Sequence, residues 1–325
     1  MKQKTTLGLG RISVIQPIVG VLSFFFMCGN VLFWAGLMHV FALVRLLQKR
    51  GGLARTEQLY DRCFAGWITT NEWWFQRVLG VYWQLDENMV KDFEHWHLMV
   101  ANHRSWADVY IILAQLNGRR PLPRVFMKQV LFWLPLVGSA TWLMGFPFMK
   151  RYSKAKLQKS PHLIGKDLET TRQSCRRFIQ RPNSVLSFVE GTRFSTKKQQ
   201  QQRSPYQYLL KPKAGGVGFV LQAMPGKFSR ITDINVLYGQ ENISFWDLLC
   251  GRLTAAQVIV RDVALPEAML KPDYQAAKKD REDFFVWFNL YWHDKDNRIA
   301  SQLAAMKSNV MPLKEVLTEG SSSQE

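Results

Sequence analysis

The chain has 325 residues, of which 47% are hydrophobic, and this is enough apolar material for one large folded domain with an appendage. Lysine and arginine total 43 against 25 aspartate and glutamate residues, so the net charge of +18 predicts an anionic partner, whether nucleic acid, an anionic bilayer, an acidic carrier or a phosphorylated substrate. Twelve tryptophans and a long apolar N-terminus favour the bilayer over nucleic acid, and no helix-turn-helix, zinc-finger spacing or RNA-binding aromatic motif is found.

The first feature along the chain is an apolar stretch at residues 12–44, which contains no Asp, Glu, Lys or Arg. A secretory signal peptide has a shorter apolar core and a small-residue cleavage site, so we interpret the stretch as retained membrane structure. As one helix it extends about 50 Å, well beyond a hydrocarbon core of about 30 Å. Basic residues flank both ends, which favours a helical hairpin broken near residues 28–30 with both ends in the cytoplasm. A single tilted span is the alternative.

The composition then divides the chain into three parts. Residues 1–52 form the membrane-embedded segment, ending at a glycine pair that can act as a hinge. Residues 53–310 form the main domain, in which strand patterns alternate with helical patterns and so predict an α/β fold. Residues 311–325 are expected to be a disordered tail.

The main domain contains a short apolar run that ends at His103, with Asp108 five residues later. In a continuous helix, positions five apart lie about 140° apart around the axis, so these two side chains can meet only across a turn. Residues 97–102 predict a buried strand and residues 106–113 a helix, with Ser105 as N-cap and Asp108 in a capping box. Asp108 can then reach back to Nδ1 of His103 and leave Nε2 free to accept a proton from a substrate hydroxyl. Alternatively, Asp108 only caps the helix and His103 is an ordinary loop residue.

A second apolar strand, about 80 residues later, ends in Glu190-Gly191-Thr192-Arg193. A carboxylate at a strand end, a glycine that permits close backbone approach and an arginine suit a site that orients a polyol and binds a phosphate. Taken alone, a strand that ends in Glu-Gly is a common turn.

Together, in this order and at this separation, these stretches resemble the glycerolipid acyltransferase family, which contains the lysophosphatidic acid acyltransferases. Residues 102–108 match its first block, residues 144–151 its second and residues 188–193 its third, and residues 131–138 and 211–216 resemble two further segments. The expected fourth block at residues 233–238 lacks the family's proline. The resemblance covers roughly residues 60–295 and is greatest to the membrane-bound lysophosphatidic acid and lysocardiolipin branch.

The resemblance implies a catalytic domain with a mixed, mostly parallel sheet flanked by helices. It implies transfer of a fatty acyl group from acyl-CoA or acyl carrier protein to the sn-2 hydroxyl of lysophosphatidic acid, giving phosphatidic acid, by direct attack. Under it His103 is the base and Asp108 orients it. The implied substrate ligands are Glu190 and Gly191 for the glycerol, and Arg193, Arg151 and the weaker candidate Lys213 for the phosphate. Thr192 is a further implied substrate-binding residue.

Several alternatives stay open. The acceptor can be another lysophospholipid, such as lysocardiolipin or lysophosphatidylglycerol, or the chain can be a non-catalytic adaptor that binds anionic membranes. A serine hydrolase is disfavoured, because Ser105 lies in no Gly-x-Ser-x-Gly elbow.

No metal or bound cofactor is expected, because the four scattered cysteines form no Cys-x-x-Cys pair and His95 and His97 lack a third ligand at a recognisable spacing. The expected partners are a lysophospholipid, an acyl donor and an anionic membrane, without nucleic acid. The expected location is a bacterial inner membrane, with the catalytic domain facing the cytoplasm.

Overall fold

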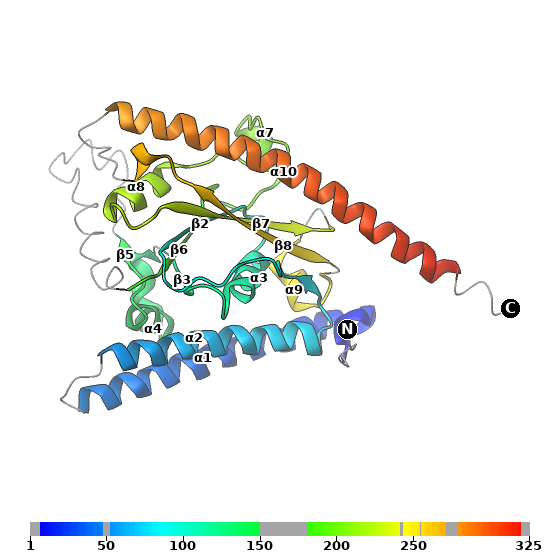
Figure 1. Cartoon of the computed structure of the whole chain (residues 1–325). Coiled ribbons are helices and arrows are strands. Elements are labelled where there is room, and N and C mark those ends of the chain that lie inside the picture. The colour runs from blue at the N-terminus through cyan, green and yellow to red at the C-terminus, as the bar shows by residue number, and fades with distance from the viewer. Residues whose placement is uncertain are drawn as a thin grey trace.

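The computed structural model describes residues 7–47, 53–125, 127–149, 181–240, 243–253, 255–270 and 278–319. A six-stranded sheet in the order β1-β8-β7-β2-β6-β3 lies at its centre (Figure 1). The strands are β1 (Trp83–Gln84), β2 (His97–Ala101), β3 (Pro123–Arg124), β6 (Ser184–Phe188), β7 (Arg230–Tyr238) and β8 (Ala256–Ala264). Every neighbouring pair is parallel except β7 and β8. The predicted α/β fold with a mixed, mostly parallel sheet is therefore confirmed.

Helices cover both faces of this sheet. One face carries α3, beneath which α1 and α2 run side by side, and the other carries α8 and the long α10 (Figure 1). The helices are α1 (Gln16–Leu47), α2 (Leu53–Trp73), α3 (Ala107–Leu116), α4 (Val137–Leu143), α7 (Thr196–Gln201), α8 (Gly215–Ala223), α9 (Phe245–Leu249) and α10 (Lys278–Glu319). Short helical turns lie at Leu9–Arg11, Ser13–Ile15, Trp74–Val78, Gln129–Trp133 and Glu267–Met269, and a small parallel pair joins β4 (Met127–Lys128) to β5 (Phe148–Met149).

Strand β7 shows how the sequence produces two cores. Successive side chains of a strand point to opposite faces of the sheet. Ile234 and Val236 belong to the core on the α3 side, whereas Ile231 and Leu237 belong to the core that α8 and α10 cover. Because both faces are covered by helices, the central strand β2 is buried along its whole length.

The N-terminal apolar stretch forms one continuous helix, so the predicted break at residues 28–30 is wrong. The side chain of Asn30 is buried and donates a hydrogen bond to the carbonyl oxygen of Trp67 in α2, at 3.3 Å. Gly66 of α2 lies against the ring of Trp34, which permits the close approach of the two helices. The hairpin is therefore made by α1 with α2. Residues Ser13–Leu47 are long and apolar enough to cross a membrane, and 33% of their most apolar window is buried within the protein.

The sequence pattern predicts a helix over roughly residues 280–295, and α10 is longer, at 42 residues. Its apolar stripe continues through Ile299, Leu303 and Met306, which pack on the sheet at the spacing of one helix face. Helix α10 ends at Glu319, so residues 311–319, expected as part of a disordered tail, are helical. The polar and basic pattern of residues 163–181 predicts a further exposed helix, but residues 163–180 lie outside the described residues.

Candidate active site

The candidate site lies at the carboxyl ends of three neighbouring parallel strands. Strand β2 lies between β6 and β7, and its last residue, Ala101, is paired with Phe188 on one side and Ile234 on the other. Parallel strands bring the residues that follow them to one edge of the sheet, where ligands bind in open α/β folds. The turn after β2 and the turn after β6 are joined there by a hydrogen bond from the backbone N–H of Phe194 to the carbonyl oxygen of His103, at 2.7 Å.

His103 and Asp108 lie in direct contact, in the geometry that their spacing predicts. Nδ1 of His103 is 2.9 Å from Oδ2 of Asp108, and Asp108 is fully buried. The imidazole stacks on the ring of Phe188, with centroids 4.2 Å apart. Among the described residues Nε2 has no hydrogen-bond partner, and 11% of the His103 side chain is exposed. The arrangement fixes the ring and presents Nε2 at the surface, as a general base requires.

The start of α3 agrees with the predicted capping box, although the helix begins at Ala107, one residue later than predicted. As predicted, the Asp108 carboxylate accepts the backbone N–H of Ser105, at 3.0 Å. It also accepts the N–H of Arg104, at 2.7 Å, so it holds the His103 turn in place. The Ser105 hydroxyl accepts the N–H of Ala107 at 3.2 Å and is fully buried. Its burial removes Ser105 as an accessible nucleophile.

Glu190 lies beneath the His103 turn and is fully buried. Its two carboxylate oxygens accept the backbone N–H groups of His103, at 2.8 Å, and Leu210, at 2.9 Å. Burial raises the pKa of Glu190 to about 7, against the opposing effect of these two hydrogen bonds. The carboxylate therefore links the His103 turn to residues 204–213, and the geometry supports a positioning role for it in place of the expected contact with glycerol.

The residues after Glu190 form a loop beside His103. Gly191 has a φ of +67°, and a Cβ added there would lie 3.0 Å from the side chain of Lys213, so glycine suits both the conformation and the space. Nζ of Lys198 donates to the hydroxyl of Thr192 at 2.8 Å and to the carbonyl oxygen of Arg193 at 2.9 Å. The side chains of Arg193 and Lys213 are exposed.

The structure thus brings together seven of the eight residues predicted for the site, namely His103, Asp108, Glu190, Gly191, Thr192, Arg193 and Lys213. Arg151 lies outside the described residues. Sequence reasoning missed Tyr238, whose hydroxyl donates to Oδ1 of Asp108. It also missed Asn102, whose side chain exchanges two hydrogen bonds with the backbone of Val236, at 2.9 and 2.8 Å. The sequence shows only that each polar group stands at the end of a buried strand, and it does not indicate the distant partner of either.

Comparison with known proteins gives the chemistry. Residues 83–238, from the start of β1 to the end of β7, match the acyltransferase family. Residues 83–238 are therefore an acyltransferase domain. The matched range contains His103, Asp108 and Glu190, and the predicted resemblance to glycerolipid acyltransferases is confirmed, so the protein is an O-acyltransferase.

No curated protein sequence matches this acyltransferase. Among solved structures, it is similar to the crystal structure of the 1-acyl-sn-glycerophosphate (LPA) acyltransferase PlsC from Thermotoga maritima. The two chains are 15% identical, with a TM-score of 0.49, and the match covers 78% of this chain and 86% of that one.

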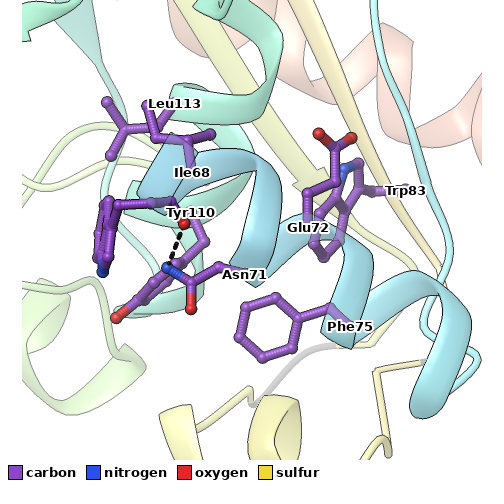
Figure 2. A pocket seen from close by; sticks show the side chains of 8 residues that line it. Ile68, Asn71, Glu72, Phe75, Trp83, Tyr110 and Leu113 are labelled. Carbon is purple, nitrogen blue, oxygen red and sulfur yellow. Dashed lines mark hydrogen bonds between the residues drawn. The ribbon is translucent and has the colours of Figure 1, made fainter. Parts of the chain in front are cut away.

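A closed pocket between α2 and α3 of the acyltransferase lies apart from this site (Figure 2). In it the side-chain amide of Asn71 donates to the carbonyl oxygen of Trp67 at 3.0 Å, and burial raises the pKa of Glu72. The residues that line the pocket are Trp67, Ile68, Asn71, Glu72, Phe75, Trp83, Tyr110 and Leu113. They include none of the residues predicted for the site, so we interpret the pocket as a small packing gap between α2 and α3.

Glu190 is expected to make the stability of the acyltransferase depend on pH. Its pKa is about 7 in the folded chain against an ordinary 4.5, so the folded state binds the proton more tightly and loses stability as pH rises from about 4.5 to about 7. The free energy of unfolding is expected to fall by about 3 kcal/mol over this pH range. Glu190→Gln removes this dependence. It also offers one acceptor oxygen to two buried amides, at a cost of about 1–3 kcal/mol.

The measurement is urea unfolding of both proteins at pH 5 and pH 8, in one detergent. The variant is expected to be clearly less stable than the wild type at pH 5, with the difference shrinking at pH 8. Glu94→Gln, at an exposed carboxylate, is the matched control and should leave the pH dependence unchanged. A difference between wild type and Glu190→Gln that is constant across pH would contradict the buried titration.

Proposed function

We propose that the protein transfers a fatty acyl group from a thioester, acyl-CoA or acyl carrier protein, to the sn-2 hydroxyl of lysophosphatidic acid, giving phosphatidic acid. The observation that carries the proposal is Nε2 of His103, which has no hydrogen-bond partner among the described residues while Asp108 holds Nδ1, together with the exposed cations Arg193 and Lys213 beside Gly191. A general base beside cationic groups suits an acceptor that carries both a hydroxyl and a phosphate.

In the proposed reaction, Nε2 of His103 accepts the proton of the acceptor hydroxyl as its oxygen attacks the thioester carbonyl. Asp108 stabilises the imidazolium that forms. The carbon–sulfur bond then breaks, the ester oxygen remains on the acceptor, and the imidazolium returns its proton to the departing thiolate. No covalent enzyme intermediate is needed, which agrees with the burial of Ser105.

Arg193 and Lys213 are the proposed phosphate ligands within the described residues, and Arg151 is a further proposed ligand from the sequence. Further basic side chains are exposed close to these residues in the sequence, namely Lys197, Arg203 and Lys211. The hydrogen bonds from Lys198 fix the backbone at Thr192 and Arg193, so Arg193 extends from an ordered base. Such preorganisation lowers the entropy that binding must overcome. Thr192 and Gly191 are the proposed neighbours of the glycerol.

We also propose that the protein binds an anionic membrane, at the inner surface of a bacterial inner membrane, through an apolar surface on the α1 side. Large side chains of α1 are exposed, among them Phe25 at 66% and Phe33 at 63%. Helix α1 contacts α4, and the turn that precedes α4 exposes Val130 at 69% and Trp133 at 79%. Exposed apolar side chains on this scale are typical of a lipid-facing surface.

The test is an acceptor competition with the purified full chain in vesicles of anionic phospholipid. Radiolabelled acyl-CoA or acyl carrier protein is supplied with equal amounts of lysophosphatidic acid, lysophosphatidylglycerol and monolysocardiolipin. Phosphatidic acid is expected as the main product, and His103→Ala should form none above background. Preferential labelling of another phospholipid would replace the proposed acceptor, and the absence of any labelled lipid product with both donors would overturn the proposal.

A further inference from the structure

Tyr238, the last residue of β7, makes a contact with the candidate site that the sequence does not indicate. Its hydroxyl donates a hydrogen bond to Oδ1 of Asp108, and its side chain is buried. The other oxygen of Asp108, Oδ2, accepts from Nδ1 of His103 at 2.9 Å and from the backbone N–H groups of Arg104 and Ser105. The Asp108 carboxylate is therefore held from both sides, by the His103 turn on one oxygen and by β7 on the other.

The fold gives the tyrosine little freedom to move. Two residues earlier on the same face of β7, the backbone of Val236 exchanges two hydrogen bonds with the side chain of Asn102, at 2.9 and 2.8 Å. These bonds fix β7 against the residue that directly precedes His103. The Tyr238 ring belongs to the core cluster that contains Ala107 and Ile111 of α3. Strand register and packing thus direct the hydroxyl at Asp108.

The phenol is suited to act as a permanent hydrogen-bond donor. Burial, and then the negative charge of Asp108, raise the pKa of Tyr238 well above its ordinary value. The hydroxyl consequently keeps its proton at any pH at which the protein is active. A hydrogen bond to a buried carboxylate is worth more than one to a neutral group, and it both orients the carboxylate and spreads its charge.

We propose that Tyr238 is a positioning residue for acyl transfer, which orients Asp108 and, through it, the imidazole of His103 in a Tyr-Asp-His chain. The inference rests on the proposed role of His103 as the general base. By holding the carboxylate, Tyr238 keeps the imidazole in the orientation in which Nε2 can accept a proton.

Two other charged groups face this chain and must be accounted for. Arg104 lies in the same turn, and its positive charge opposes the rise in the pKa of Tyr238. Glu190 lies beneath His103, and its negative charge and that of Asp108 repel each other. Both are retained when Tyr238 is replaced by phenylalanine. A change in the kcat of that variant consequently reports the lost hydroxyl.

The experiment is a full kinetic profile of Tyr238→Phe, which keeps the ring and removes only the hydroxyl. We expect kcat to fall roughly 10-fold, with an unchanged KM for the acceptor. Tyr60→Phe, which removes another buried phenol hydroxyl from α2, is the matched control and should match the wild type.

A double-mutant cycle separates positioning from packing. In an Asp108→Asn background, Tyr238→Phe should cause no further loss, because the hydroxyl acts only through the carboxylate. The inference is overturned if Tyr238→Phe has the kcat of the wild type, or if its loss of activity is the same in both backgrounds. Full activity in His103→Ala is a separate result that would defeat the proposed base itself.

Discussion

Replacement of His103 by alanine is expected to reduce kcat by roughly 10²- to 10⁴-fold, the usual contribution of a general base. The imidazole is the group at this site whose free nitrogen is exposed while its other nitrogen is bonded to a carboxylate, at 2.9 Å. Without it the acceptor hydroxyl must lose its proton to water. The KM for the acceptor should change little, because the proposed phosphate ligands Arg193 and Lys213 remain.

The substitution is expected to leave the fold intact, which makes the kinetic result interpretable. The hydrogen bonds that hold this turn use the backbone of residue 103, namely its N–H to Glu190 and its carbonyl oxygen to the N–H of Phe194. Alanine retains both. The measurement is the initial rate of labelled lipid formation at saturating donor, with thermal unfolding recorded in parallel.

Two control variants sharpen this test. His95→Ala removes an exposed imidazole that also contacts an aspartate, Asp92, and should retain wild-type rates. Ser105→Ala removes the buried hydroxyl and should keep most of the activity, whereas a serine hydrolase would lose it. Equal rates for His103→Ala and the wild type would show that the base lies elsewhere.

The pair of His103 and Asp108 could be predicted from the sequence because the whole arrangement is local. Five residues span the strand end, the turn and the first turn of α3, so the change from strand to helix periodicity places the two side chains. The start of α3 was predicted to within one residue for the same reason. In the structure the Asp108 carboxylate binds His103 and also accepts the backbone N–H of Ser105, as a capping box requires, and the helix begins at Ala107.

Contacts between distant parts of the chain explain what the sequence did not predict. The direction of the Glu190 carboxylate depends on the N–H of Leu210, and the hydroxyl of Tyr238 meets a carboxylate 130 residues earlier in the chain. The prediction of a break in the apolar stretch was wrong for the same reason, since the side chain of Asn30 is buried against α2. A polar residue in an apolar helix indicates either an end or a partner, and only the tertiary structure distinguishes these.

A buried ion pair between β7 and α10 is expected to be the most sensitive point for stability. Asp233 and Lys295 are both buried, with Nζ of Lys295 2.6 Å from Oδ1 of Asp233. Asp233 also accepts hydrogen bonds from Tyr291 at 2.7 Å and Arg298 at 2.6 Å. Burial opposes the charge on Asp233, but the charges of Lys295 and Arg298 hold its pKa below the ordinary value. Burial also lowers the pKa of Lys295, which the Asp233 charge partly offsets.

Asp233→Asn is expected to destabilise the protein by about 3–5 kcal/mol at pH 7, because it leaves the ammonium of Lys295 buried without a counter-charge. Lys295→Met should cost less, since Asp233 keeps Arg298 and Tyr291 as partners. The double variant should be more stable than the sum of the two single effects predicts. Urea unfolding followed by tryptophan fluorescence measures all three, and equal, additive losses would contradict the argument.

The pH dependence of Asp233→Asn gives an independent check. Without Asp233, the pKa of Lys295 falls further in the folded state, while in the unfolded chain it returns to about 10.4. The folded variant then binds fewer protons than the unfolded one, so its stability rises as pH increases from 7 towards 10 and its deficit relative to the wild type narrows. A deficit that stays constant or widens over this range would contradict the assignment.

The destabilisation caused by Asp233→Asn should also affect the candidate active site, because α10 contacts residues 204–213 as well. Nε1 of Trp292 donates to the carbonyl oxygen of Leu210 at 3.0 Å, and Asp296 accepts the N–H groups of Gln207 and Tyr208 at 2.7 and 2.8 Å. Leu210 in turn binds the Glu190 carboxylate that holds the His103 turn. Asp233→Asn is therefore expected to lose acyltransferase activity at a lower temperature than the wild type, before global unfolding is detected.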